Sequence, residues 1–539
     1  MLIHRWMRCG WLWTLALLSL HPLSAHADGN QSGEAEWTVL VYMNADNDLD
    51  ASALADINEM EAANLGNLNV IVQVDREGQG EKGQLLSSAW AGTKRLKIKQ
   101  DNNLSQIGST ELDDLGEMDM GDYVNLAEFA SWGIMNFPAK KYALIVWSHG
   151  NGFKAEPNSL PLKVSIDGTS HTHIDLRNLE DALVMIQEDT QKRIELLGFD
   201  ACLMQMTEVG YQLKNHYTLL VGSEDLESND GWAYDQLLTR LSALPPADQT
   251  PLAFADIIVQ TTLDYYRRKG VAATLSVAEA KAVMTLSQKV QAFVKAVNFR
   301  RKQQLDALQK SYSEAQRFRN AGADYVDLFD YFKTLRDKLT PKNDKDKEMK
   351  AAIDAILELQ PQVILRKDNV GQSVNRAQGL TLYLPRSWQY QEKYSDLAFA
   401  KATAWGEFIQ KFNASMFTYE LQLLAGTLFI PGFELDPDET EDPTRDIVVI
   451  GDSRRQGQSE LISNMSDEIL TALQRGLPEK LAALNSASQS TEGLNKLRKV
   501  VALKLKAPLR NNEIREEDKK LVEEFLGKVK GLGLIAAGP

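Results

Sequence analysis

The chain has 539 residues, of which 44% are hydrophobic and 25% are charged, and its formal net charge is −15. This length exceeds what one ordinary hydrophobic core needs, so we expect a globular protein of two or three domains. Because phosphate binding requires basic surfaces, the acidic charge balance argues against a nucleic-acid-binding protein.

The N-terminus has the features of an export signal. Arg5 and Arg8 precede an apolar run at 11–20, and a small-x-small cleavage site follows at 25–27. The run is too short to span a bilayer comfortably, although an uncleaved anchor is the alternative interpretation. We therefore predict a signal peptide over residues 1–27 and a mature protein in the periplasm or outside the cell, with no stable membrane insertion.

Removal of this segment leaves one cysteine. Cys9 is lost with the signal peptide, and Cys202 is then the only thiol of the mature chain. A single cysteine cannot form an internal disulfide in an exported protein. Free cysteines are often buried and inert, so a functional role for Cys202 depends on its surroundings.

Short apolar strands alternate with helices over the next part of the chain. This alternation predicts a mostly parallel sheet that helices cover on both faces, an αβα sandwich. Between the second and third strands, residues 84–120 resemble a hairpin or loop excursion. The polar turn at 44–50 supplies N-cap candidates for the helix that follows it. The expected strands are 37–43, 69–75, 142–147, 194–199, 217–222 and 272–277, and the expected helices are 50–64, 125–136 and 175–188.

The character of the chain changes after about residue 280. Long amphipathic helices are expected at 281–316 and 347–359, followed by a strand at 379–385 and a helix at 403–412. An acidic, proline-containing linker comes later. We therefore divide the mature chain into a catalytic core, a mixed helical region that completes or packs on it, the linker, and a mostly helical C-terminal extension of unknown role. These parts span 28–280, 281–433, 434–446 and 447–539.

Two predicted strands end in residues that carry chemistry. One apolar run leads to His149 and Gly150, and another leads to Cys202. Because reactive groups in parallel sheets gather at the carboxyl ends of strands, these two side chains are expected to lie close together. His149 would then activate the thiol as a base, and the backbone N–H groups of Gly150 and Cys202 would form an oxyanion hole. A helix over 203–214 would place Cys202 at its N-terminus, where the helix dipole favours a thiolate.

Asp200 lies two residues before the cysteine and has two interpretations. It is either a helix N-cap or turn residue, or an anion that holds a basic substrate side chain by charge-assisted hydrogen bonds. The chemistry of Asp200 alone does not favour either interpretation.

Four segments together resemble the clostripain-type cysteine peptidases of the caspase-like clan, which also includes gingipains and legumain. They are 37–50, 142–153, 197–208 and 221–232. The resemblance extends over about 37–280, with weaker similarity at 325–332 and 379–385. It implies a caspase–haemoglobinase-like sandwich, a dyad of Cys202 and His149, and cleavage of proteins or peptides after Arg or Lys.

The same resemblance assigns further residues. It implies that Asp200 lines the pocket for the basic side chain and that a second acid follows the next strand, with Asp230 the better match and Asp225 the competitor. Family members commonly mature by self-cleavage after a basic residue between the histidine and the cysteine. Lys163 is the first candidate for this cut and Lys154 the second.

The sequence itself predicts no metal site. Several family members need calcium, but the stretch 46–50 lacks the glycine and distal glutamate of an EF-hand, so it is interpreted as a cap and turn. His171 and His173 would make only half of a zinc site, and we expect them in an exposed loop.

Two alternatives to an Arg/Lys-specific endopeptidase remain. One is a non-catalytic binding or scaffold protein that has kept the fold. The other is a relative within the clan that prefers a different residue before the cut, such as Asn or Asp. The presence of Cys202, His149 and Asp200 favours the peptidase.

Overall fold

The computed structural model describes residues 34–77, 90–152, 163–318, 324–385, 390–413 and 415. The predicted signal peptide, the acidic linker and the C-terminal extension lie outside these residues. So does Lys154, the second candidate for self-cleavage.

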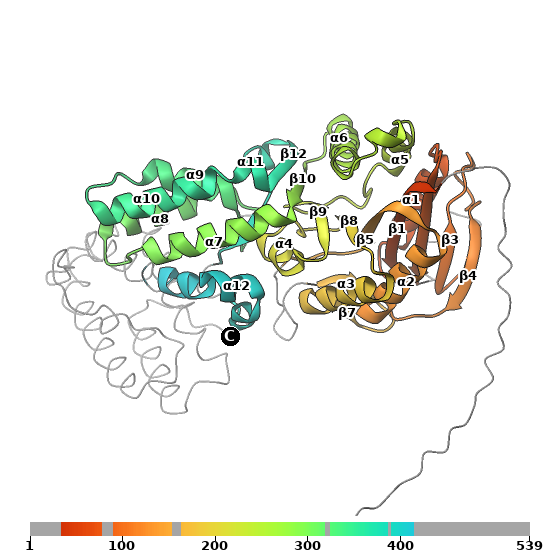
Figure 1. Cartoon of the computed structure of the whole chain (residues 1–539), viewed down its shortest axis with the longest axis horizontal. Helices are drawn as coiled ribbons and strands as arrows, with labels where there is room; N and C mark the ends of the chain where they lie inside the picture. Colours follow the sequence, from red (N-terminus) through yellow and green to blue (C-terminus); the bar gives the residue numbers. More distant parts are fainter. Residues whose placement is uncertain are drawn as a thin grey trace, which may run out of the picture. The chain divides into compact units, whose positions relative to one another are not determined.

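A nine-stranded sheet forms the centre of the described protein, in the order β12-β10-β9-β8-β5-β1-β2-β3-β4 (Figure 1). The five middle strands, from β9 to β2, run parallel to one another. The outer strands on both sides pair antiparallel. The nine strands are β1 (Ala35–Ala45), β2 (Leu68–Arg76), β3 (Thr93–Lys97), β4 (Thr110–Gly116), β5 (Ala139–Trp147), β8 (Ile194–Asp200), β9 (Tyr217–Gly222), β10 (Ala273–Glu279) and β12 (Ile364–Val370).

Alternate residues of the parallel strands enter two separate hydrophobic cores. In β5, Leu144 and Val146 belong to one core, whereas Ala143 and Ile145 belong to the other. Side chains of successive strand residues point to opposite faces, so the two cores lie on the two faces of the sheet. This arrangement confirms the predicted αβα sandwich.

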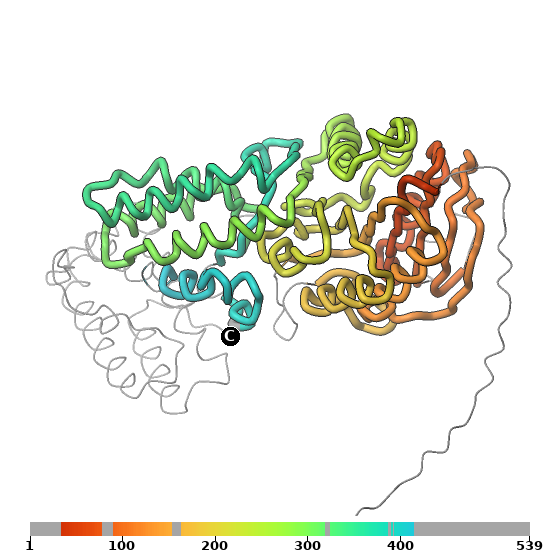
Figure 2. The backbone as a smooth tube through the Cα atoms, in the orientation of Figure 1, coloured from red at the N-terminus to blue at the C-terminus, as the bar shows by residue number. Residues whose placement is uncertain are grey.

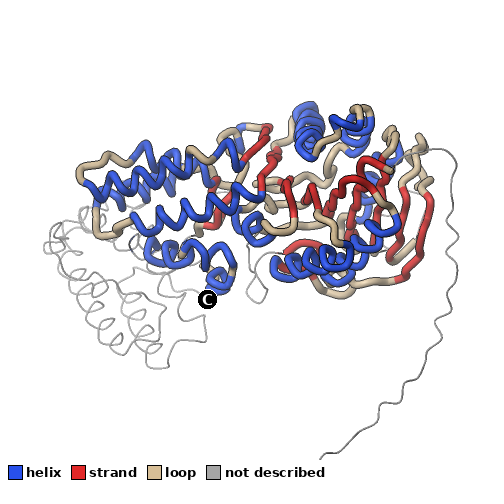
Figure 3. Tube along the Cα trace, in the orientation of Figure 1, coloured by secondary structure: helices blue, strands red, loops and turns tan. Residues whose placement is uncertain are grey.

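Helices cover both faces, as the secondary-structure colouring shows (Figure 3). The first core includes residues of α2, α3, α4 and α7, and the second includes residues of α1, α5 and α6. The seven helices are α1 (Asp50–Ala62), α2 (Tyr123–Asn136), α3 (Leu176–Thr190), α4 (Thr207–Leu213), α5 (Tyr234–Ser242), α6 (Pro251–Lys269) and α7 (Ala280–Ala296).

The edges of the sheet were only partly foreseen. The expected hairpin within 84–120 is present as β3 and β4. The strand expected at 272–277 is present as β10, but it runs antiparallel to β9. Strand β12 was not predicted; it brings residues from beyond the helical region back to the edge of the sheet.

Several helices begin at a residue whose side chain caps the first turn, but α1 does not. Asp122 caps α2 through the N–H of Val124, and Asp175 caps α3. The prediction that the turn at 44–50 caps α1 through a side chain is wrong, because the N-cap is Leu49. The asparagine oxygens of this turn accept backbone N–H groups inside the turn instead, as in Asn47 Oδ1 and the N–H of Leu49 (3.0 Å).

The chain beyond β10 packs into the first core, from the green α7 to the blue α12 (Figure 2). A short antiparallel pair, β11 (Tyr325–Asp327) and β13 (Thr381–Tyr383), lies within it. The expected helix at 403–412 is present over 405–413. The helices after α7 are α8 (Lys302–Glu314), α9 (Leu328–Lys338), α10 (Asp344–Leu357), α11 (Gln360–Val363) and α12 (Ala398–Thr403).

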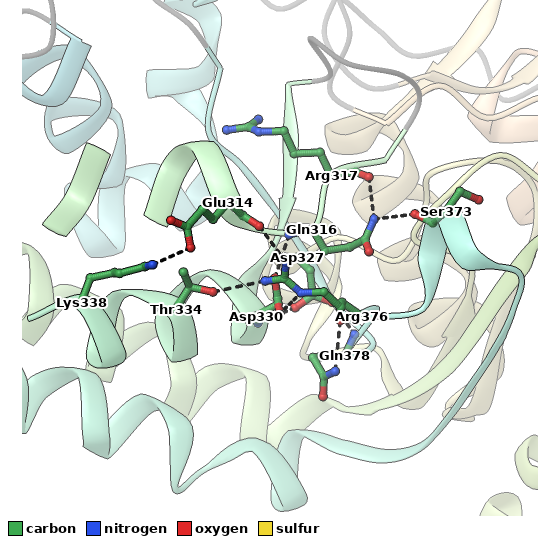
Figure 4. A network of polar contacts seen from close by, with 10 residues as sticks. All are labelled: Glu314, Gln316, Arg317, Asp327, Asp330, Thr334, Lys338, Ser373, Arg376 and Gln378. Atoms are coloured by element: carbon green, nitrogen blue, oxygen red, sulfur yellow. Dashed lines mark hydrogen bonds and ion pairs between the residues drawn. The ribbon is translucent and has the colours of Figure 1, made fainter. Parts of the chain in front are cut away.

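A polar network joins α8, β11 and α9 to the segment before β13 (Figure 4). At its centre, the guanidinium of Arg376 donates to both carboxylate oxygens of Asp330 (3.1 and 2.6 Å). Asp327 caps α9, and burial followed by the charge of Asp327 raises the pKa of Glu224, which follows β9. This interaction connects the network to the loop that follows a central strand of the main sheet.

Candidate active site

The register of β5 and β8 places His149 and Cys202 at equivalent positions beyond two neighbouring strands. Trp147 pairs with Asp200 across these parallel strands, and the N–H of Ser148 donates to the carbonyl of Asp200 (3.4 Å). His149 and Cys202 each lie two residues beyond the paired positions. The prediction that the strands before His149 and Cys202 are neighbours in the sheet is therefore confirmed.

Gly150 brings the two strand ends into direct contact. A Cβ atom at this position would lie 2.4 Å from the carbonyl oxygen of Cys202 and 3.2 Å from Cβ of Ala201. A contact of 2.4 Å with a backbone atom is too short for any side chain. Glycine is therefore required here because the loop after β5 packs against the backbone beside the thiol.

The surroundings of Cys202 differ from the prediction. The expected helix over 203–214 is wrong at its start, because α4 begins only at Thr207. Leu203 has a φ of 62°, in the left-handed region, and its N–H donates to the carbonyl of Asp225 (3.1 Å). Both features break helical geometry, so no helix N-terminus points at the sulfur.

A backbone amide takes the place of the expected helix dipole. The N–H of Glu227 donates to Sγ of Cys202 (3.2 Å). Hydrogen bonding to the charged form of a group favours that form, so this amide stabilises a thiolate. Cys202 is half-buried.

His149 is held by an acid from another strand end. Its Nε2 lies 2.6 Å from Oδ1 of Asp48, which belongs to the turn after β1. The imidazole is about one-third exposed and Asp48 is 77% exposed, so the pair is partly solvated. Because Nε2 contacts Asp48, Nδ1 is the ring nitrogen that can exchange a proton with another group.

Asp200 is a buried acid and not a helix cap. The N-cap of α4 is Met206, which excludes the capping reading. Oδ2 of Asp200 accepts hydrogen bonds from the N–H of Trp232 (3.1 Å) and the hydroxyl of Tyr234 (2.9 Å). Burial raises the pKa of Asp200 to about 7, although the Tyr234 and Trp232 hydrogen bonds oppose that change.

Two further acids lie near Asp200, and we call Asp56, Asp200 and Glu227 the Asp200 cluster. Burial, followed by the charge of Asp200, raises the pKa of both Asp56 and Glu227 well above the usual range. Oδ2 of Asp56 accepts from the indole N–H of Trp147 (2.7 Å). Gly231 fits between two of the carboxylates, because a Cβ there would lie 2.6 Å from Asp56 and 3.1 Å from Asp200.

The other predicted acids occupy different settings. The carboxylate of Asp230 pairs with Nζ of Lys269 (2.8 Å), and both side chains are close to half exposed. The charge of Asp230 also contributes to the raised pKa of Asp56. Asp225 offers its backbone carbonyl to Leu203.

Lys163 lies close to the histidine loop. It is the first residue of β6 (Lys163–Ile166), which pairs with β7 (His173–Asp175). Its N–H donates to Oδ1 of Asn151 (2.9 Å), and its carbonyl accepts from the N–H of Asn151 (3.3 Å). Lys163, the predicted processing residue, is therefore hydrogen-bonded to Asn151, which follows His149 by two positions in the sequence.

The histidines expected in an exposed loop are only partly there. His171 is exposed, but His173 lies half-buried in β7. Burial and the charge of Lys163 lower the pKa of His173.

Sequence reasoning missed three residues of this site: Asp48, Asp56 and Glu227. Asp48 was interpreted only as part of a turn, although it follows a central strand at the same edge as His149. That position at a strand end was the available signal. Asp56 and Glu227 carry no local signal, because their contacts depend on how α1 and the loop after β9 fold over the strand ends.

A sheet with a parallel centre, covered on both faces and bearing a histidine and a cysteine at neighbouring strand ends, places this protein in the caspase-like class. A model of the clostripain family matches residues 41–412, and the chain therefore belongs to that family. It is 30% identical over 232 residues to clostripain from Hathewaya histolytica. That match covers 40% of this chain and 44% of clostripain, less than half of the relative's length.

Solved structures share the fold. An inactive zymogen C11 protease from Parabacteroides distasonis is 19% identical, with a TM-score of 0.52, over 69% of this chain and 99% of its own. A secreted C11 cysteine protease from Bacteroides thetaiotaomicron, solved in complex with an irreversible peptide inhibitor, gives the same identity, TM-score and coverage. Within the described residues, no helix has the length and hydropathy needed to cross a bilayer.

Proposed function

We propose that this protein is an exported cysteine endopeptidase that cleaves peptide bonds after Arg or Lys. The observation that carries the proposal is the register of β5 and β8, which sets His149 and Cys202 at equivalent positions beyond two adjacent parallel strands. Membership of the clostripain family supports the same chemistry.

The proposed reaction has two covalent steps. His149 takes the proton of the Cys202 thiol, and the sulfur attacks the carbonyl carbon of the scissile bond. His149 then protonates the departing amine, which leaves a thioester on Cys202. A water molecule that gives its proton to His149 attacks the thioester, and the acid product leaves as the thiol is restored.

Backbone and side-chain groups of the chain support these steps. The N–H groups of Gly150 and Cys202 would stabilise the oxyanion, since Gly150 packs against the carbonyl of Cys202. Asp48 would orient the imidazole through its contact with Nε2.

We propose that the Asp200 cluster binds the basic side chain of the substrate residue before the cut. It begins at the residue that ends β8, two positions before the nucleophile. Burial, followed by the charge of Asp200, raises the pKa of Asp56 and Glu227, so a positive charge brought by the substrate would relieve this repulsion. Asp230, which pairs with Lys269, would add a weaker and more solvated charge.

We also propose export by the signal at residues 1–27 and self-cleavage after Lys163. The contacts of Lys163 with Asn151 hold this peptide bond near the histidine loop. One structural neighbour is described as an inactive zymogen, which fits a family whose members mature by cleavage.

The activity is tested with matched peptides that differ only at the residue before the cut. We expect cleavage after Arg and Lys, and a loss of at least about 10⁴-fold in Cys202→Ala and in His149→Ala. His173→Ala, at another half-buried histidine, serves as the control and should keep its activity. Cleavage by Cys202→Ala at the wild-type rate would contradict the proposal.

The two processing proposals are tested by mass spectrometry of the purified mature protein. We expect a first N-terminus after residue 27 and a second after Lys163. The second should be absent from Cys202→Ala; a cut after Lys163 in that variant would assign processing to another protease.

A further inference from the structure

The two-stranded sheet of β11 and β13 contacts the segment that follows Cys202. The N–H of Thr381, in β13, donates to the carbonyl of Gln205 (3.0 Å), and its carbonyl accepts from the hydroxyl of Thr207 (2.7 Å). Met206 forms a parallel β-bridge with Thr381. Strand β13 is therefore bound along the stretch between Cys202 and the start of α4.

A buried acid of α4 fixes the same strand. Oε1 of Glu208 accepts from the N–H of Tyr383 (3.0 Å) and from the hydroxyl of Tyr394 (2.8 Å). The rings of Tyr383 and Tyr394 pack with their centroids 4.7 Å apart. Tyr383 also pairs with Tyr325 across the small sheet, and the centroids of these two rings lie 6.3 Å apart. Tyr325 is buried, so its ring is held by the packing of β13 against α4.

Tyr325 reaches from this small sheet to the loop after β5. Its hydroxyl donates to the carbonyl of Asn151 (3.1 Å). Gly152 packs between two side chains, because a Cβ atom there would lie 3.0 Å from the hydroxyl oxygen of Tyr325 and 3.2 Å from Cβ of Leu203. The loop after β5 is therefore enclosed between Tyr325 and the residue that follows Cys202.

We propose that Tyr325 is a positioning residue whose hydroxyl holds the loop after β5, and with it His149, in the geometry that activates Cys202. This role rests on the proposed peptidase chemistry. The carbonyl that Tyr325 binds belongs to Asn151, two positions after His149. The other contact of the imidazole, with Asp48, is partly solvated and so restrains it weakly. Because proton transfer needs the imidazole within hydrogen-bond reach of the thiol, a small shift of this loop lowers the rate.

The bond from Tyr325 would gain importance after self-cleavage. In the uncut chain, Asn151 is also bound to Lys163, the first residue of β6. A cut after Lys163 separates this residue from the rest of β6, so its contacts with Asn151 lose their anchor in that strand. The hydroxyl of Tyr325 comes from beyond the cut site and from a different sheet, so cleavage leaves its restraint on the loop in place.

Tyr325→Phe tests the proposal, because it removes the hydroxyl and keeps the ring beside Tyr383. Steady-state kinetics are measured on the full mature chain with the best Arg peptide. We expect kcat to fall about 3- to 10-fold, as the loss of one hydrogen bond allows. KM should change by less than about twofold, because the substitution leaves the acids of the substrate pocket untouched.

Tyr217→Phe is the matched control. The buried hydroxyl of Tyr217 also donates to a backbone carbonyl, that of Gly210 (2.9 Å). Tyr217 is the first residue of β9, so it lies at the opposite end of the parallel strands from His149 and Cys202. We expect similar decreases in Tm in both variants, because each loses one hydrogen bond of the same kind. Only Tyr325→Phe should lose kcat.

A second measurement follows the thiol without any peptide cleavage. Cys202 is the only thiol of the predicted mature chain, so the rate of alkylation by iodoacetamide reports on it alone. A histidine held beside a thiol extends this reaction to lower pH. We expect the alkylation profile of Tyr325→Phe to move about 0.5–1 pH unit upward, toward that of His149→Ala, because a 3- to 10-fold effect corresponds to about that shift. Tyr217→Phe should match the wild type.

The alkylation profile decides the outcome. An unshifted profile in Tyr325→Phe would overturn the proposal, whatever the change in kcat. An equal upward shift in Tyr217→Phe would also overturn it, because the effect would then follow from lost stability. If the wild type cleaved no peptide, the proposed peptidase activity would fail, but the alkylation comparison would still test Tyr325.

Discussion

Two groups of three acids lie near the strand ends of the sheet: the Asp200 cluster, and a second group of Asp46, Asp75 and Glu117 whose carboxylate oxygens lie within 4.8 Å of one another. They differ in what their oxygens contact. In the Asp200 cluster, donors of the protein bind Asp56 and Asp200, among them the indole of Trp147 and the hydroxyl of Tyr234. In the second group, Asp46 and Asp75 are buried and each leaves one oxygen without a hydrogen-bond partner.

The two groups therefore differ in how fully the protein itself satisfies their carboxylate oxygens. Fixed hydrogen bonds hold Asp200 in place when no cation is bound, so a substrate can enter and leave. The unpartnered oxygen in that cluster is Oε2 of Glu227, the residue whose amide contacts the Cys202 sulfur. In the second group, Asp46 accepts from the N–H of Thr169 and Asp75 from the hydroxyl of Thr93.

Among the substitutions considered, Asp200→Asn should cause the largest loss of cleavage after Arg and Lys. Removal of a buried charge partner typically costs about 2–5 kcal/mol, so we expect kcat/KM for Arg and Lys peptides to fall roughly 30- to 5,000-fold. Cleavage of a peptide with a neutral residue before the cut should change little. An equal loss on all substrates would show that Asp200 only maintains the fold.

Asp48→Asn should reduce kcat by about 10-fold, with less effect on KM. The variant keeps a polar contact with His149 but removes the carboxylate charge from that hydrogen bond, which weakens the hold on the imidazole. The effect is limited because Asp48 is largely exposed. Steady-state kinetics on the best Arg peptide measure it, with Asp181→Asn, an equal change of charge at an exposed position of α3, as the control. Retention of full activity would remove Asp48 from the orienting role.

The preference for basic residues should depend on pH. Burial raises the pKa of Asp200 to about 7, so its charged fraction grows as pH rises through that value. The ratio of kcat/KM for an Arg peptide to that for a Gln peptide should therefore increase by up to about 10-fold from about pH 6 to about pH 8. The ratio cancels ionisations that both substrates share. It should be flat in Asp200→Asn, and a flat ratio in the wild type would contradict the role of Asp200.

The same raised pKa has a consequence for stability. The folded protein binds the proton of Asp200 more tightly than the unfolded chain does, so this proton favours folding at low pH. That contribution is fully present below the unfolded pKa and is lost as pH rises through about 7.

Asp230→Asn should have the smallest effect. Its ion pair with Lys269 is close to half exposed, and exposed pairs contribute at most about 1 kcal/mol. We expect kcat/KM for Arg and Lys peptides to fall by less than about 5-fold. A loss as large as that of Asp200→Asn would make the two acids equal partners in the pocket.

The parallel sheet and the pairing of its reactive strand ends could be predicted, because both follow from patterns local to each strand. Runs such as β5 and β8 are apolar on both faces, which only a covered parallel sheet explains. His149 and Cys202 follow these runs directly, and Gly150 marks a close approach of backbones.

The details around the thiol could not be predicted, because contacts distant in the sequence decide them. Leu203 is diverted from helical geometry, and its N–H bonds to the carbonyl of Asp225 in a loop after the next strand. Asp48 reaches His149 across 101 positions of the chain. The wrong helix start after Cys202 also produced the wrong capping alternative for Asp200.

Cleavage after Lys163 would divide the central sheet between two polypeptides. β1, β2 and β5 would belong to the first fragment, and β8, β9 and β10 to the second. The neighbouring strands β5 and β8 come from opposite sides of the cut and are joined by a continuous hydrogen-bonded register. The nicked enzyme would therefore migrate as two bands under denaturing conditions but behave as one particle in native solution, with the histidine on one chain and the nucleophile on the other.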